Sequence, residues 1–134
     1  MANALYPQGK AGIMRGDIVL LTDTIKFVIV DLADYTYSST HEFLADIPSG
    51  ARVAITSALS SKVIEDTAAF KSDNAIAATV TGDEIEAIIM FKDTGDAATS
   101  RLILFQDTGV TGAPLTPDGS DIRISMNASG WFTL

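Results

Sequence analysis

Residues 88–95 read IIMFKDTG and residues 102–109 read LILFQDTG, so an apolar run followed by Asp-Thr-Gly occurs twice, fourteen residues apart. Short apolar runs that end at turn residues are typical of strands buried in a sheet. A strand, a turn and a second strand at this spacing favour antiparallel neighbours. The two segments therefore predict adjacent antiparallel strands.

The rest of the chain also has the composition of a β protein. Ile, Val and Thr together make up 35 of the 134 residues, and 13 Asp against 4 Glu favour turns over helices. A chain of this length buries a core without disulfides. We expect a mainly β protein, a small antiparallel sandwich or barrel-like domain of about seven or eight short strands. Nine segments are candidates for these strands: residues 18–21, 25–31, 52–56, 62–66, 75–81, 84–91, 101–105, 121–126 and 131–134.

Turn residues predict two hairpins and one short helix. Thr81-Gly82-Asp83 is expected to join strands 75–81 and 84–91, and residues 127–130 are expected to close a C-terminal hairpin. Residues 40–47 (THEFLADI) are the best helix candidate, capped by Ser39 or Thr40 and ended by Pro48.

The chain is expected to form one β-rich domain over residues 16–134. Pro7, Gly9 and Gly12 weaken any helix in residues 1–15, so this segment is interpreted as an N-terminal arm or a weak helix. Its start lacks the apolar run of a signal peptide.

Charge argues against nucleic acid and anionic membranes as partners. The net charge is −8, and the nine Lys and Arg residues are spread singly along the chain. Proteins that bind phosphates cluster their cations. The apolar stretches are far shorter than a membrane span. Because the chain has no Cys, thiolate catalysis and Cys-ligated metals are excluded.

The repeated Asp-Thr-Gly invites comparison with aspartic proteases, which bring two carboxylates together from two symmetric halves. Two copies only fourteen residues apart cannot be such halves, and antiparallel strands would place them at opposite ends. Each copy, preceded by Lys92 or Gln106, is interpreted as a group of turn residues that ends a strand.

His41 is the only histidine, which excludes a His-rich zinc site. No Gly-x-Ser-x-Gly elbow accompanies it, so it is interpreted as an ordinary residue in the first turn of the helix at 40–47.

Carboxylates gather at three places: Asp83 with Glu84 and Glu86, Asp93 with Asp96, and Asp118 with Asp121. None fits the twelve-residue calcium loop. A weak calcium site at residues 118–121 stays open, and the other groups are interpreted as solvated faces. We expect no catalytic, cofactor-binding or metal-binding residues, and no enzyme activity.

Most of the ten aromatic residues fall on expected strands and are assigned to the core. Tyr35 and Tyr37 alternate in a polar loop, where they form either an outward contact patch or an edge strand. With Trp131 they are the candidates for stacking on a sugar.

Several stretches resemble small structural proteins of tailed-bacteriophage virions. The resemblance begins at residues 16–18 (GDI), 24–31 (TIKFVIVD) and 34–36 (DYT), and its most specific part is residues 41–54 (HEFLADIPSGARVA). It resumes at residues 92–95 (KDTG), residues 100–103 (SRLI) and the aromatic C-terminal hairpin. It thus covers nearly the whole chain, although residues 1–15 contain more Gly and Pro than the family pattern.

The resemblance implies a virion structural module without catalytic residues, assembled in the cytoplasm of the bacterial host. A capsid decoration (cement) protein that binds the major capsid protein and stabilises the head is the first expectation, with homo-oligomers expected. The alternatives are a tail or head–tail junction component and a carbohydrate- or receptor-binding β-sandwich.

Overall fold

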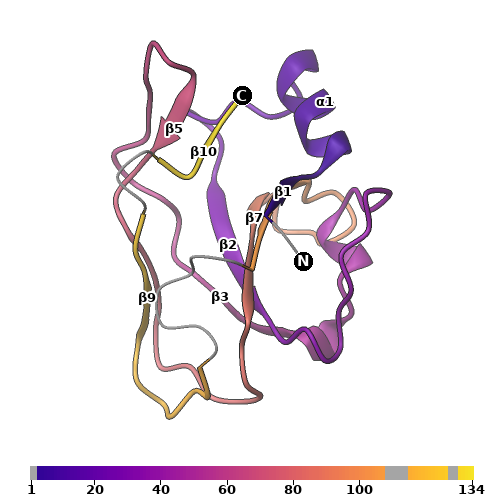
Figure 1. Cartoon of the computed structure of the whole chain (residues 1–134), viewed down its shortest axis with the longest axis vertical. Coiled ribbons are helices and arrows are strands. Elements are labelled where there is room, and N and C mark those ends of the chain that lie inside the picture. Colours follow the sequence, from indigo (N-terminus) through magenta and orange to yellow (C-terminus); the bar gives the residue numbers. More distant parts are fainter. Residues whose placement is uncertain (1–2, 108–114, 127–129) are drawn as a thin grey trace.

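The computed structural model describes residues 3–107, 115–126 and 130–134, which form two layers of antiparallel strands (Figure 1). The elements, in chain order, are β1 (Ala4–Leu5), α1 (Pro7–Arg15), β2 (Ile25–Val30), the 3₁₀ helices η1 (Leu44–Asp46) and η2 (Ser49–Ala51), β3 (Arg52–Ile55), β4 (Val63–Ile64), β5 (Ala69–Lys71), β6 (Ala75–Ala77), β7 (Ala87–Lys92), β8 (Leu102–Gln106), β9 (Ile122–Ile124) and β10 (Phe132–Thr133). The described part of the chain is therefore mainly β, with the architecture of a small β-sandwich, as predicted.

The first layer is a five-stranded sheet in the order β1-β8-β7-β2-β3. Strands β7 and β8 pair antiparallel, with Ile89 opposite Phe105, so the prediction from the repeated segment is confirmed. Strand β2 pairs with β7 over its whole length. Both strands are apolar at nearly every position because both faces of this sheet are covered.

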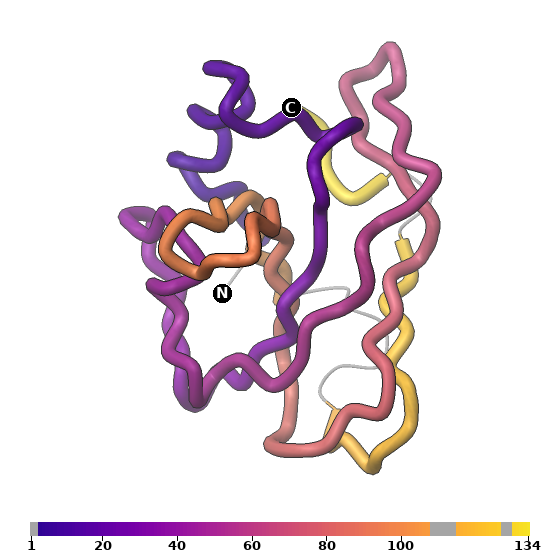
Figure 2. The backbone as a smooth tube through the Cα atoms, turned by 180° about the vertical axis from the view of Figure 1, so that it is seen from behind, coloured from indigo at the N-terminus to yellow at the C-terminus, as the bar shows by residue number. Residues whose placement is uncertain are grey.

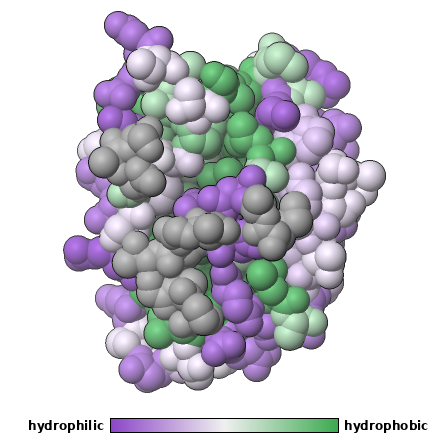
Figure 3. Space-filling model, in the orientation of Figure 1, coloured by the Kyte–Doolittle hydropathy of each residue, from purple (hydrophilic) through white to green (hydrophobic). Residues whose placement is uncertain are grey.

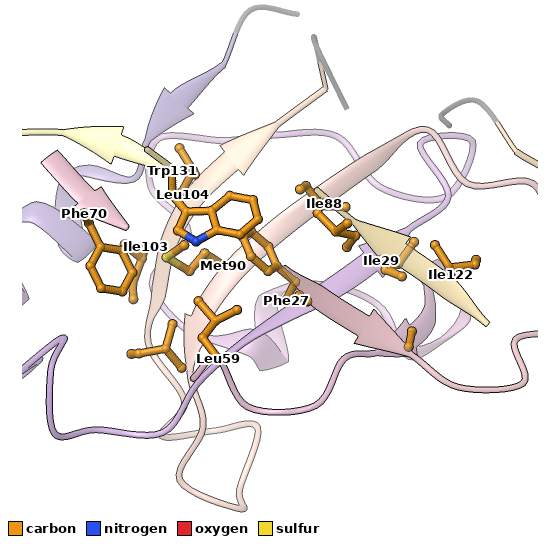
Figure 4. Close-up of a cluster of buried hydrophobic side chains, with 14 of the residues drawn as sticks. Phe27, Ile29, Leu59, Phe70, Ile88, Met90, Ile103, Leu104, Ile122 and Trp131 are labelled. Atoms are coloured by element: carbon orange, nitrogen blue, oxygen red, sulfur yellow. The ribbon is translucent and has the colours of Figure 1, made fainter. Parts of the chain in front are cut away.

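Two smaller sheets, β10-β5-β4 and β6-β9, pack against one face of the first sheet. Figure 4 shows the core between the layers, where the indole of Trp131 lies against Phe27 with ring centroids 4.7 Å apart. Met90 from β7 and Phe70 from β5 belong to the same buried cluster. Side chains that alternate along β2, β7 and β9 contribute to this core, and residues of β5, β6, β8 and the connecting loops complete it.

Loops cover the opposite face of the five-stranded sheet. Figure 2 shows residues 31–51 beside the loop 93–101, and backbone bonds join them, including Ala45 N–H to the Ala97 carbonyl at 3.0 Å. Leu44 and Ile47 point into a second buried cluster with Phe91 and Phe105. The sheet is therefore sandwiched between strands on one side and irregular chain on the other.

The predicted helix over residues 40–47 is wrong: only η1, three residues long, forms there. The Asp46 carboxylate accepts the N–H groups of Glu42 and Phe43, which in an α-helix would need other partners. The Leu44 N–H bonds to the Ser100 carbonyl at 2.8 Å. Because the N–H groups of Leu44 and Ala45 bond across to the neighbouring loop and those of Glu42 and Phe43 bond to a side chain, a longer helix does not propagate.

Both predicted hairpins are also wrong, although the strands exist. Strand β6 pairs with β9, and β7 pairs with β2 and β8, so the turn at 81–83 links two different sheets. Strand β10 pairs with β5, so strands β9 and β10 do not form the terminal hairpin. The connection at 127–129 lies outside the described residues.

The predicted strand at 18–21 is a turn, because Thr22 and Asp23 both donate backbone bonds to the Val19 carbonyl. Residues 7–15 form helix α1, which begins at Pro7 and ends at Gly16 in the left-handed region (φ 86°). Gly9 lets the helix touch β8: a Cβ there would lie 2.4 Å from the Leu102 carbonyl oxygen. Among the described residues, no helix is long and apolar enough to cross a membrane.

Candidate functional site

The aspartates of the two Asp-Thr-Gly motifs, Asp93 and Asp107, do not approach each other, and Thr108 and Gly109 lie outside the described residues. Asp93 follows β7 and Asp107 follows β8, and because these strands run antiparallel the two carboxylates lie at opposite ends of the pair. The Asp93 carboxylate instead pairs with Lys26 at 2.7 Å and accepts the Gly95 N–H. The Lys26 hydrogen bond, the larger effect, and the Gly95 bond lower the pKa of Asp93. This carboxylate stays charged and organises a turn, as the sequence predicted for the motif.

His41 ends a chain of three hydrogen-bonding side chains. The Tyr6 and Tyr35 hydroxyls are 2.7 Å apart, and the Tyr35 hydroxyl lies 2.8 Å from His41 Nδ1. A catalytic triad would instead join this nitrogen to a carboxylate. His41 precedes η1 and lies in no helix, so the predicted helical position is wrong.

Burial dominates the acid–base behaviour of the two tyrosines. Tyr6 is fully buried and Tyr35 is 3% exposed. Loss of solvation raises the pKa of Tyr6 far above its ordinary value and raises the pKa of Tyr35 to about 12. Both phenols are therefore neutral donors at physiological pH.

Both alternatives predicted for Tyr35 and Tyr37, an outward contact patch and an edge strand, are wrong, since Tyr35 is not exposed and residues 35–37 form no strand. Tyr35 is buried, and the half-buried Tyr37 ring packs on Tyr6 and Phe105, with centroids at 5.0 and 5.2 Å. Trp131 is 8% exposed, and its Nε1–H donates to Ser72 Oγ at 2.7 Å. The alternation of Tyr35 and Tyr37 in a polar loop does not indicate that the loop folds back over the sheet. These rings are not free to stack on a sugar.

The carboxylates singled out in the sequence mostly bind nearby backbone donors. Asp118 accepts the Ser120 N–H and hydroxyl, and Asp121 accepts the Thr79 N–H at 2.9 Å. Glu86 accepts the Leu32 N–H at 2.7 Å. These bonds hold loops together, which explains why acidic residues are frequent at turns in this chain.

Folding brings together a different acidic group that sequence reasoning missed. Asp31, Asp34 and Asp83 offer carboxylate oxygens within 4.8 Å of one another. The pairing of Val30 with Ala87 places the end of β2 next to the chain entering β7. Asp31 is buried and accepts the Ala33 N–H, whereas Asp34 and Asp83 are exposed. Exposed acidic groups gather in this way without an ion, so we assign no metal to them.

One end of the molecule exposes large hydrophobic side chains. It is formed by the end of α1, the loop that follows it, β4 and the C-terminus, which lie at the same end of the molecule in Figures 1 and 2, with the C-terminus between the other two elements. Two contacts join these segments: Lys62 Nζ donates to the Asp23 carbonyl, and the Leu134 N–H donates to the Ala68 carbonyl. We call this surface the apolar end, and its exposed side chains are Met14, Val19, Leu21, Val63, Ile64 and Leu134.

The face drawn in Figure 3 carries hydrophobic side chains in its upper half. A cavity of about 250 Å³ opens between β10 and the β1–β8 edge. Its walls include Leu104, Trp131 and Phe132, together with the polar Asn3 and Gln106. The cavity is thus part of the seam between the two layers.

No family model matches the chain, and no curated protein matches it. The resemblance described above therefore depends on the quoted residues alone.

Proposed function

We propose that this chain is a structural protein of a bacteriophage virion, which attaches to the assembled head as a decoration protein and binds the major capsid protein. The first support is the resemblance, whose most specific part is residues 41–54. In the fold residues 41–51 of this block cover one face of the central sheet, with Leu44, Ile47 and Ala51 buried, and residues 52–54 belong to β3 of that sheet. The apolar residues of this block serve the packing of the core, as expected for a family of structural proteins.

The observation that carries the proposal is the apolar end. Met14 is 80% exposed, Val63 51% and Leu134 53%. Exposed hydrophobic side chains gathered in one place mark protein–protein contacts more often than isolated ones do. On a lattice of capsid subunits, modest contacts of this kind add up because many copies bind at once.

The same surface supports the capsid protein over a nucleic acid as the partner. Its cations are partly committed to the chain itself: Lys92 pairs with Asp23 at 3.2 Å, and Lys62 donates to the Asp23 carbonyl. Removing such cations from their partners to bind phosphate would cost energy, whereas an apolar protein surface requires no such exchange.

A binding experiment tests the proposal. Heads prepared without this chain are mixed with the purified protein and with a Val63→Ser/Ile64→Ser variant, and binding is measured by co-sedimentation. We expect the variant to bind at least about tenfold more weakly, because apolar anchors dominate interface energies. We also expect bare heads to lose thermal stability relative to decorated heads.

The matched control is Ile55→Ser/Ile76→Ser, which changes side chains of comparable exposure (45% and 39%) on β3 and β6. It should bind as the unchanged protein does. Equal losses in both variants would contradict a role for the apolar end. Failure to bind heads, together with a copy number in virions that matches tail rings and not the capsid lattice, would replace decoration by the tail or head–tail junction alternative.

A further inference from the structure

A hydrogen-bonded chain connects the interior of the loop-covered face to the surface. It begins at Tyr6, immediately before α1, passes through Tyr35 and ends at His41. Tyr6 and Tyr35 are more than nine-tenths buried, whereas His41 is partly exposed. A proton from solvent can therefore reach one end of a buried network.

Counting protons shows that the network is satisfied in one arrangement. Each tyrosine hydroxyl has one proton to donate. Tyr6 donates to Tyr35, and Tyr35 donates to Nδ1 of His41, so that both protons have acceptors. If Nδ1 carried the proton, it would donate to Tyr35, and one buried hydroxyl proton would have no acceptor among the described residues. The uncharged ring must therefore carry its proton on Nε2.

Protonation of the imidazole breaks this arrangement. Both ring nitrogens are then donors, and Nδ1–H faces the Tyr35 hydroxyl. The Tyr35 proton must turn towards Tyr6, whose own proton has no other acceptor in the described structure. Leaving a buried hydroxyl proton without an acceptor is unfavourable, so the charged ring and the intact network exclude each other.

The charged groups around His41 provide the alternative partner. On η1, the exposed Asp46 carboxylate interacts electrostatically with His41, and its pKa is lowered mainly by the Phe43 and Glu42 N–H groups. Glu42 is already paired with Arg101 at 2.9 Å. The aromatic rings packed around the two tyrosines are uncharged: Tyr37 packs on Tyr6 and on Phe105 of β8, and Phe105 also packs against Tyr35. Asp46 is thus the group towards which a charged His41 is drawn.

We infer that His41 is a proton-sensitive latch: uncharged, it holds the loop 31–43 onto Tyr6 through Tyr35, and on protonation it leaves Tyr35 for Asp46 and releases the loop. The latch is a property of the fold and stands independently of the proposed virion role. Its effect is local, because the backbone ladder of the central sheet is untouched.

The tautomer of His41 in the unchanged protein is the first test. Nitrogen-15 NMR at pH 8 distinguishes a protonated Nε2 from a protonated Nδ1. We expect Nε2–H with Nδ1 as the acceptor. Finding Nδ1–H would overturn the inference without any variant.

Hydrogen exchange at pH 7.5 and 5.0 is the second test, corrected for the intrinsic effect of pH. The reporters are the N–H of Asp34, bonded to the Asp31 carbonyl at 3.1 Å, and the N–H of His41, bonded to the Ser38 carbonyl at 3.1 Å. We expect the protection of both to fall at least about fivefold at pH 5.0.

Tyr35→Phe, which removes the central hydroxyl, should show no such dependence on pH. Tyr37→Phe is the matched control, since the Tyr37 hydroxyl makes no hydrogen bond in the described part of the chain, and it should respond as the unchanged protein does. An equal response in Tyr35→Phe, or no response in the unchanged protein, would overturn the latch. Should Tyr35→Phe fail to fold, the tautomer measurement still decides.

Discussion

The two faces of the five-stranded sheet are covered by different kinds of chain. One face meets strands of the two smaller sheets, and its cluster is apolar, with Phe27 and Trp131 near its centre. The other face meets loops, and its cluster includes the hydrogen-bonded hydroxyls of Tyr6 and Tyr35. Strands satisfy their own backbone groups in ladders, whereas loops need side chains such as Glu86 and Asp46 to do so.

We expect the strand-covered face to be rigid and the loop-covered face to respond to pH. On the strand-covered face the buried cluster of the described residues contains no ionisable side chain, because it consists of apolar residues and Trp131. On the loop-covered face, backbone N–H groups depend on carboxylates, and a histidine is attached to the buried tyrosines. We therefore expect the first face to set the stability of the fold and the second to set its local motions.

Truncating one aromatic side chain on each face tests whether the two faces contribute differently to stability. These substitutions should have the largest effect on the free energy of unfolding. Phe27→Ala should lower the free energy of unfolding by about 5 kcal/mol, because ladders on both sides prevent the cavity from closing. Phe105→Ala should cost nearer 3 kcal/mol, because the loops over it can relax. Urea unfolding followed by tryptophan fluorescence measures both. Phe27 and Phe105 are equally buried, so equal or reversed costs would contradict the contrast.

Helix α1 and the residue before it contact both buried clusters. Substitutions of its glycines therefore test how closely the helix is held against the sheet. Tyr6 before the helix packs on the loop-covered face, and Ile13 packs on the strand-covered one. Gly9→Ala would place a Cβ 2.4 Å from a backbone oxygen of β8, so we expect a loss of about 2 to 3 kcal/mol despite the better helix propensity.

Gly12→Ala is the comparison for Gly9→Ala. A Cβ there meets the flexible end of Ile18 at 3.0 Å, and we expect a change below about 1 kcal/mol. Thermal unfolding followed by circular dichroism distinguishes the two. If both variants were neutral, α1 would not be held against β8 as described.

Strands were predictable where a local pattern decides them. The apolar runs of β2 and β7, and the alternation of residues 121–126, all mark strands that form. Pairing over long distances was not predictable: no local signal says that β6 joins β9 or that β10 joins β5. The two faces of strand β8 could not be assigned from the alternation of its residues. A register shift after Met90 puts the consecutive residues Ile103 and Leu104 on the same side of the sheet.

For the candidate site, sequence reasoning predicted that two carboxylates lie apart, and it missed the network that folding brings together. The spacing of the two Asp-Thr-Gly motifs was enough to separate their carboxylates. The network of Tyr6, Tyr35 and His41 joins residues up to 35 positions apart, and it exists because a loop folds over a sheet face. The helix expected at 40–47 failed for the same reason, since its donors bind across to another loop.

The smallest expected effect concerns a surface charge that belongs to neither face. Asp93 pairs with Lys26 with one quarter of its side chain exposed, and the Lys26 bond holds the pKa of Asp93 below its usual range. A lowered pKa contributes stability above the ordinary Asp value of about 4, and the contribution disappears as the pH falls below it. Asp93→Asn should therefore cost less than about 1 kcal/mol at pH 7, and the cost should shrink progressively as the pH falls below about 4, as judged by urea unfolding. Asp66→Asn, at an exposed carboxylate, should be neutral throughout. A cost for Asp93→Asn as large as that of Phe105→Ala would mean that surface charge, and not the covering of the faces, controls the stability of this fold.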